Sequence, residues 1–168
     1  MQENMYLALL ILSTVGNGLM AGLFCSFSNF MMKALADLPP AEGARAMQSI
    51  NRVILNPPFF AVFFGTAALS LVAVVLGVRN LGNPSAAWAL AGGAAYVLGC
   101  FAVTAAGNVP LNDKLEAVDA DSEEGQALWA DYLVRWTWLN HLRSAATLFS
   151  TAAFTIAAYY AGRAVALQ

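Results

Sequence analysis

Charged residues are scarce in this chain. They make up 11% of its 168 residues, whereas hydrophobic residues make up 60%. Soluble globular domains carry about 25% charged residues, so this composition excludes that class and predicts an integral membrane protein. The net charge is −2 and the basic residues are scattered. Without a continuous positive stripe to follow a phosphate backbone, nucleic-acid binding is excluded as well.

Motifs for metals and nucleotide cofactors are also missing. The chain has one histidine and two cysteines, Cys25 and Cys100, which lack the Cys-x-x-Cys spacing of redox pairs and zinc sites. A transition-metal or haem site needs more ligands than one histidine supplies. The acidic run 119–124 lacks the spacing of an EF-hand loop, and no glycine-rich nucleotide fingerprint is present. We therefore predict no metal and no nucleotide cofactor, and leave open a quinone or flavin bound without a motif.

Long hydrophobic runs are what the chain has instead. A membrane-spanning helix needs about 20 apolar residues, and four stretches are long enough: 5–30, 58–78, 86–107 and 142–161. The start of the chain lacks the basic region of a cleaved signal peptide, so we interpret the first stretch as retained. The sequence predicts an all-α fold, a membrane four-helix bundle forming a single domain over residues 1–168.

The connections between these spans are unequal. Residues 79–85 are short and rich in turn formers, which predicts that the second and third spans are antiparallel neighbours. The connections 34–57 and 108–140 are long and lie on the opposite side. Apolar residues recur at helical spacing in both, so we expect amphipathic helices at 41–55 and 123–139 that form a lid.

Two features of the second long connection carry further expectations. Pro110, between Asn108 and Asn112, is expected to break the third helix. The aromatic residues Trp129, Tyr132 and Trp136 then recur on one face of the following helix. They form either an aromatic belt at the lipid headgroups or the lining of a pocket.

An even number of spans places both termini on the same side of the membrane. The Lys and Arg residues gather on the other side, and the positive-inside rule then puts the termini outside and the long connections in the cytoplasm. The basic residues beside the long connections are Lys33, Arg45, Arg52, Lys114, Arg135 and Arg143, against Arg79 and Arg163 near the termini.

Polar residues at the ends of the apolar spans are costly in hydrocarbon and mark the candidate site. They are Asn108, Asn112, Trp136, Trp138, Asn140, His141 and Arg143. On the first span Asn17, Phe24 and Ser28 share a face, because 11 residues at about 100° each return nearly to the same direction. Asn17 is expected to bond across the bundle. His141 and Arg143 point about 160° apart on a helix, so Arg143 pairs more readily with Asn140.

A family resemblance rests on several of these segments. They are Asn108-Val-Pro-Leu-Asn-Asp-Lys-Leu115, Trp129 with Tyr132, Trp136-Thr-Trp-Leu-Asn-His-Leu-Arg143, Gly22-Leu-Phe-Cys-Ser-Phe-Ser-Asn-Phe-Met31 and Ala46-Met-Gln-Ser-Ile-Asn51. Together they resemble the bacterial branch of the DUF1772 membrane family, whose fungal relatives include anthrone oxygenases. The resemblance implies a four-helix bundle in the bacterial inner membrane and, for characterised relatives, oxidation of an anthrone to its quinone by dioxygen.

That chemistry needs a base and groups that stabilise an anion, with dioxygen as co-substrate and no metal. We expect His141 to act as the base and Arg143 to hold the developing oxyanion, with Asn108 and Asn112 as further catalytic donors. The expected substrate-binding residues are Asn140, Trp136, Trp138, Tyr132, Phe24, Asn17, Ser28, Gln48 and Asn51.

A second class of function stays open at this point. The same residues can seal a ligand cavity or lock the bundle in a non-enzymatic membrane protein that binds or moves a small hydrophobic ligand, or that serves as a structural partner. Expected partners are the lipid bilayer and a small hydrophobic aromatic ligand, and a homo-oligomer is left open. A cavity wide enough for an aromatic ring and lined by Asn108, Asn112, His141 and Arg143 would favour the enzyme, and a collapsed cluster the structural role.

Overall fold

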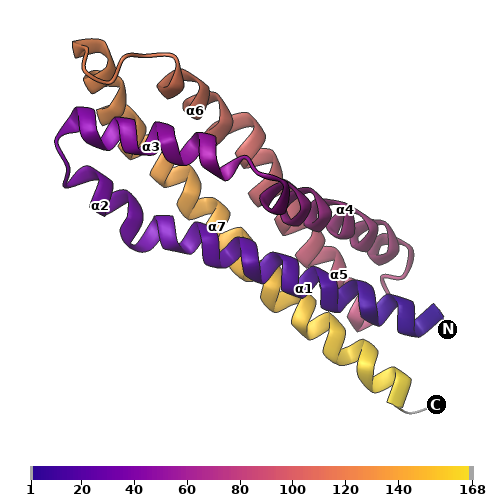
Figure 1. Ribbon diagram of the computed structural model, residues 1–168. Helices are drawn as coiled ribbons and strands as arrows, with labels where there is room; N and C mark the ends of the chain where they lie inside the picture. Colours follow the sequence, from indigo (N-terminus) through magenta and orange to yellow (C-terminus); the bar gives the residue numbers. More distant parts are fainter. Residues whose placement is uncertain (1, 167–168) are drawn as a thin grey trace.

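A computed structural model describes residues 2–166, and these residues are helical throughout apart from short connections (Figure 1). No strand occurs in this part of the chain. The predicted all-α fold class is confirmed. The elements, in chain order, are α1 (Gln2–Ser26), η1 (Phe27–Met31), α2 (Met32–Ala36), α3 (Pro40–Ile54), α4 (Pro57–Arg79), α5 (Pro84–Ala94), η2 (Ala95–Ala102), η3 (Thr104–Asn108), α6 (Val109–Glu116) and α7 (Glu123–Ala166).

Asparagine followed by proline begins two of the long helices. Asn56 accepts a hydrogen bond from the Phe59 backbone N–H at 3.0 Å, and Asn83 accepts one from Ser85 N–H at 2.9 Å. Each asparagine thereby satisfies a backbone donor that the first helical turn leaves free. The proline that follows has no N–H to satisfy and suits the first helical position. These caps define where α4 and α5 start.

The helices α1, α4, α5 and α7 lie side by side in the molecule (Figure 1). α1 contacts α7 and α4, and α5 contacts α4 and α7. α1 begins and α7 ends at the same end of the molecule, as Figure 1 shows. α3 precedes α4 nearly in line and packs on α6 and α7. The connection predicted to be a tight turn, between α4 and α5, does join antiparallel neighbours.

Three of these helices are long and apolar enough to cross a membrane: residues 3–36, 57–79 and 84–116. The chain is therefore a membrane protein. α7 is long enough but is not among these apolar spans. Serines and threonines interrupt its second half, where the fourth span was expected. With 44 residues, α7 is about 66 Å long, roughly twice the hydrocarbon thickness. The four-span count stays a prediction.

The end of the molecule away from the termini forms a compact unit that we call the cap. It consists of η1, α2, α3, α6 and residues 123–140 of α7. Buried aromatic and aliphatic side chains fill its core, including Phe27, Met47, Trp129, Tyr132 and Trp136. The amphipathic helix expected at 41–55 is α3, whose Ala44 and Met47 face this core. The cap therefore has a buried core of its own.

Two expectations about the second long connection are wrong. The third helix does not break at Pro110 but runs on to Glu116, because the π-helical segment η3 widens the turn just before the proline ring. The helix expected at 123–139 is not a separate lid element, since it continues into the expected fourth span as one helix, α7.

The aromatic-belt interpretation of that helix is also wrong. Trp129, Tyr132 and Trp136 are all at least 96% buried, whereas belt residues face the lipid headgroups. Their rings stack in sequence, with centroids 5.6 Å and 5.8 Å apart. They lie in the interior because α3 and α6 fold over this face of α7.

Candidate functional site

Arg143 lies at the centre of the candidate site, where the cap meets the rest of α7. Its side chain is buried, with 5% of the residue exposed. The guanidinium donates to Asn140 Oδ1 at 2.8 Å and to Thr104 Oγ1 at 3.4 Å. One nitrogen of this buried cation, Nε, has no hydrogen-bond partner in the described structure.

Aromatic rings cover the Arg143 guanidinium. The Phe24 ring centroid is 4.3 Å from its central carbon and the Trp136 ring centroid 5.0 Å. Both distances fall within the cation–π range. All ion pairs found among residues 2–166 lie on the surface of the cap, and none includes Arg143. The positive charge is thus held by amide, hydroxyl and ring contacts instead of a carboxylate.

Asn140 joins Arg143 to the first helix. Its Nδ2 donates to the Phe24 carbonyl at 2.8 Å and to Ser28 Oγ at 2.7 Å. Ser28 Oγ also lies 2.9 Å from Ser144 Oγ and 2.9 Å from His141 Nδ1. The result is a continuous chain of hydrogen bonds from exposed His141 through Ser28 and Asn140 to buried Arg143.

Asn112 organises a second polar group next to the first. Its Oδ1 accepts hydrogen bonds from the Tyr132 hydroxyl and from Trp136 Nε1, both at 2.8 Å. Asn51 donates weakly to the Tyr132 oxygen at 3.4 Å. Burial raises the pKa of Tyr132 above its ordinary value, since ionisation would place a charge in the cap core. Tyr132 therefore stays a neutral donor to Asn112.

Asn108 lies between these two groups. Its Nδ2 donates to the Trp136 carbonyl at 3.2 Å, and its buried Oδ1 has no partner in the described structure. Trp136 thus connects the groups, because its carbonyl binds Asn108, its indole N–H binds Asn112 and its ring faces Arg143. An acceptor at Asn108 and a donor at Arg143 are buried without a partner in the described structure, as is the Thr137 hydroxyl next to Trp136.

Several predicted site residues lie apart from this cluster. Trp138 is 71% exposed on the outer face of α7 and lines neither polar group. Asn17 is buried farther along α1, where its Nδ2 bonds to Ser13 O of its own helix at 2.9 Å instead of across the bundle. Gln48 ties α3 to the Leu115 and Val118 carbonyls. His141 is exposed and reaches the cluster only through Ser28.

The two clearest cavities in residues 2–166 lie outside this cluster. Neither is lined by Asn108, Asn112, His141 or Arg143. One cavity, of about 390 Å³, lies between α1, η1 and α3 and includes Phe27 in its lining. The Phe27 ring contacts Trp136 edge-on at 5.4 Å. We call this cavity the side groove. The Phe27 ring lies between it and Trp136 of the polar cluster.

Sequence reasoning missed Phe27, Thr104 and the π-helical segments. Ser28 lies in η1, and Thr104 and Asn108 lie in η3. Each extra residue in a turn rotates the next part of the helix by about 100° relative to a regular α-helix, and π segments are frequent at functional sites. The spacing of Thr104 four residues before Asn108 and Phe27 three after Phe24 was the available signal.

A family model described as anthrone oxygenase matches residues 59–156. This match covers more than half of the chain and includes Asn108, Asn112, Asn140, His141 and Arg143. The chain belongs to the anthrone oxygenase family. No curated protein and no solved structure matches it. Family membership supports a membrane oxygenase-like function, whereas substrate and mechanism must be argued from the site.

Proposed function

We propose that this chain is a membrane oxygenase that oxidises a flat, lipid-soluble phenol or anthrone with dioxygen and without a resident metal. The observation that carries the proposal is the Arg143 guanidinium, which is buried between two aromatic rings without a carboxylate partner. Removing a cation from water costs several kcal/mol unless an anion compensates it. The substrate anion supplies that compensation.

The reaction first removes the acidic proton of the substrate, which leaves a delocalised enolate. Arg143 stabilises its oxygen through the unused Nε–H, and such preorganised donors are often the largest contribution to catalysis. The enolate passes electrons to dioxygen, and the resulting substrate hydroperoxide loses water. One anthrone and one dioxygen thus become one quinone and one water, so atoms and electrons balance without another reductant.

Ser28 and His141 give the proton a route to the surface. Ser28 Oγ lies 2.9 Å from His141 Nδ1 and belongs to the hydrogen-bond chain that ends at Arg143. A histidine side chain can accept a proton and exchange it with water. In this proposal Ser28 passes the proton outward and His141 accepts it. His141 is exposed and does not touch the buried substrate itself, so it acts through Ser28.

The side groove is the proposed approach for the substrate. Its volume of about 390 Å³ lies within the roughly 300–1,000 Å³ of small-molecule sites. Its lining is mainly aliphatic and aromatic, from Leu23 and Phe27 on one wall to Ile50 and Val53 on the other. Rotation of the Phe27 ring then opens the path from the groove to Arg143.

A second function competes, and the closed packing of the cluster favours it. If no substrate enters, Arg143, Asn140 and Ser28 lock α1 to α7 in a non-enzymatic membrane protein that holds a small hydrophobic ligand elsewhere. The two functions make opposite predictions for Arg143. A catalytic cation is retained at a cost in stability, whereas a lock contributes to stability.

Replacement of Arg143 by Met therefore tests the proposal. An apolar side chain of similar length in place of a buried ion is often neutral or stabilising by about 1–4 kcal/mol. Loss of the anion-stabilising donor costs a rate factor on the order of a hundred or more. We expect quinone formation from anthrones under air to fall to the blank while the melting temperature holds. Arg135→Met, on the exposed face of the same helix, is the control and should keep both.

Two outcomes would reject the enzyme. One is wild-type protein that forms quinone no faster than the blank, and the other is an Arg143→Met variant that loses stability but keeps its rate. Ser28→Ala and His141→Ala should each slow oxidation, and His141→Ala should change the pH dependence of the rate near neutrality.

Placement in the bacterial inner membrane, with four spans and both termini outside, is proposed as well. Labelling of single cysteines at positions 81 and 121 on the same side would contradict it.

A further inference from the structure

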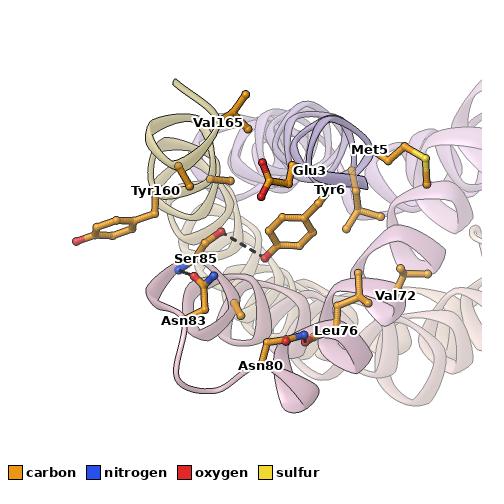
Figure 2. Close-up of a pocket in the computed structure, with 14 residues that line it drawn as sticks. Glu3, Met5, Tyr6, Val72, Leu76, Asn80, Asn83, Ser85, Tyr160 and Val165 are labelled. Atoms are coloured by element: carbon orange, nitrogen blue, oxygen red, sulfur yellow. Dashed lines mark hydrogen bonds between the residues drawn. The ribbon is translucent and has the colours of Figure 1, made fainter. Parts of the chain in front are cut away.

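A cavity of about 550 Å³ lies at the end of the molecule where α1 begins and α7 ends. Figure 2 shows its lining, to which α1, α4, α5 and α7 all contribute. Along α7, Tyr160 in this lining is 17 residues from Arg143, which corresponds to about 26 Å. That distance is close to the roughly 30 Å hydrocarbon thickness. The cavity is thus separate from the polar cluster and near the opposite membrane surface.

The cavity has an aliphatic wall that is open toward the lipid. Leu9 and Leu76 line it, together with Met5 and Val72, which are 65% and 46% exposed on the outer surface of α1 and α4. Side chains that both line a cavity and face the membrane mark a lateral opening. A ligand that reaches the cavity therefore comes from the bilayer, and the aliphatic wall suits an alkyl chain.

Hydrogen-bonding groups gather at one side of the same cavity. Ser85 Oγ lies 2.8 Å from the Ala157 carbonyl and 3.3 Å from the Tyr6 oxygen. The Ser85 hydroxyl is the donor in both contacts, and its one hydrogen lies mainly toward the closer Ala157 carbonyl, so the Tyr6 oxygen only accepts. The Tyr6 hydroxyl, which points toward Ser85 in Figure 2, then keeps its own hydrogen for donation. Asn83 uses its Oδ1 on the Ser85 N–H, so its amide hydrogens are a second source of donors.

The charge of the lining selects the kind of head group. Among residues 2–166, those that line the cavity include Glu3 and no Lys, Arg or His. No cation in the lining compensates an anionic head, whereas an uncharged hydroxyl or ester carbonyl can accept hydrogen bonds from Tyr6 and Asn83. We propose that this cavity binds an uncharged single-chain glycerolipid of the membrane, with its head at Tyr6 and Asn83 and its chain along Leu9 and Leu76.

Native mass spectrometry of the full chain, released from a sugar-based detergent, tests this proposal. The probes are 1-monooleoylglycerol and oleate, which share one alkyl chain and differ in head-group charge. We expect one bound 1-monooleoylglycerol per chain and at least about tenfold weaker binding of oleate. Equal binding of the two probes would overturn the proposed selectivity and with it the site.

Two variants locate the binding. Ala164→Phe fills the cavity from an exposed position and should weaken 1-monooleoylglycerol binding at least about tenfold, whereas Ala152→Phe, on the exposed face of α7 outside the lining, should leave it unchanged. Tyr6→Phe removes one donor and should weaken binding about fivefold. Binding that survives Ala164→Phe would overturn the proposal. The result does not depend on oxygenase activity, since Ala164 is remote from Arg143.

Discussion

The middle of α7, at Arg143, and its last turns, at Tyr160, place polar groups in opposite settings. At Arg143 buried side chains bond to one another, and neither of the two cavities described above includes Arg143 in its lining. At Tyr160 a cavity of about 550 Å³ stays open, with polar groups on one side and aliphatic side chains on the other. A charge in a membrane protein interior must be enclosed by partners, whereas a few neutral groups at the membrane surface tolerate an open space. The buried charge and the open cavity therefore lie at different positions along α7.

The largest effect on this comparison should come from Asn112. Its Oδ1 accepts from both Tyr132 and Trp136, so Asn112→Ala leaves two buried donors unpaired. Each unpaired donor costs about 1–3 kcal/mol. We expect the free energy of unfolding, from titration with SDS in mixed micelles, to fall by about 2–6 kcal/mol. Asn112→Asp keeps two acceptor oxygens, so its free energy of unfolding should fall less. Equal losses for the two variants would show that the hydrogen bonds from Tyr132 and Trp136 do not cause the effect.

A pair of glycines tests the packing between the two ends of the molecule. A Cβ on Gly93 would lie 2.5 Å from the Ser70 carbonyl oxygen, whereas a Cβ on Gly65 meets nothing within 4 Å. Forcing two backbones apart typically costs about 1–3 kcal/mol. Gly93→Ala should destabilise the protein by that amount in the same SDS titration, and Gly65→Ala should not. Similar values for both would mean that α4 and α5 do not approach closely in the membrane.

The two tyrosines sharpen the contrast directly. Tyr132 is buried and donates at 2.8 Å, whereas Tyr6 is half-buried and makes a 3.3 Å contact. Tyr132→Phe should cost about 1 kcal/mol or more and Tyr6→Phe only a few tenths. Thermal melting of both variants in one detergent measures the difference. A larger loss for Tyr6 would reverse the proposed division between a packed end and an open end.

The contribution of Tyr132 to stability depends on pH with a defined sign. The folded-state pKa of Tyr132 is raised by burial, so its contribution to stability is complete below the unfolded-state pKa of about 10. The contribution is lost as the pH rises through the raised value, because only the unfolded chain ionises freely. Unfolding free energies between pH 9 and 11 should therefore fall less steeply in Tyr132→Phe than in the wild type, and parallel curves would contradict this.

The smallest effect is expected at Arg45, which is the exposed counterpart of Arg143. Its ion pair with Asp121 raises the pKa of Arg45, but both side chains lie at the surface. Exposed pairs contribute about 0–1 kcal/mol and are screened by salt. Arg45→Ala should change the melting temperature by little, and by less still in 0.5 M salt. A large loss would indicate that the cap depends on its surface charges.

Local patterns explain how much of the fold could be predicted. Long apolar runs, Asn-Pro caps at residues 56–57 and 83–84, and the amphipathic stripe of α3 follow from short-range chemistry. The helix through Pro110 and the continuous α7 were mispredicted. A proline favours a break locally, and only neighbouring turns can absorb its ring without one. The burial of the stacked aromatic residues could not be predicted either. A stripe of rings has the same spacing in a lipid-facing belt as in a core, and only tertiary contacts distinguish the two.

The sequence by itself determined that the chain is a membrane protein, that it is all-α, and that Arg143 pairs with Asn140 on one helical face. Composition and helical periodicity are enough for each of these. Only the tertiary structure decided that Trp138 faces outward, that Ser28 joins His141 to the buried cluster, and that space is left at Tyr6 instead of at Arg143. Those outcomes depend on how four long helices approach one another, and that approach is a sum of contacts far apart in the chain.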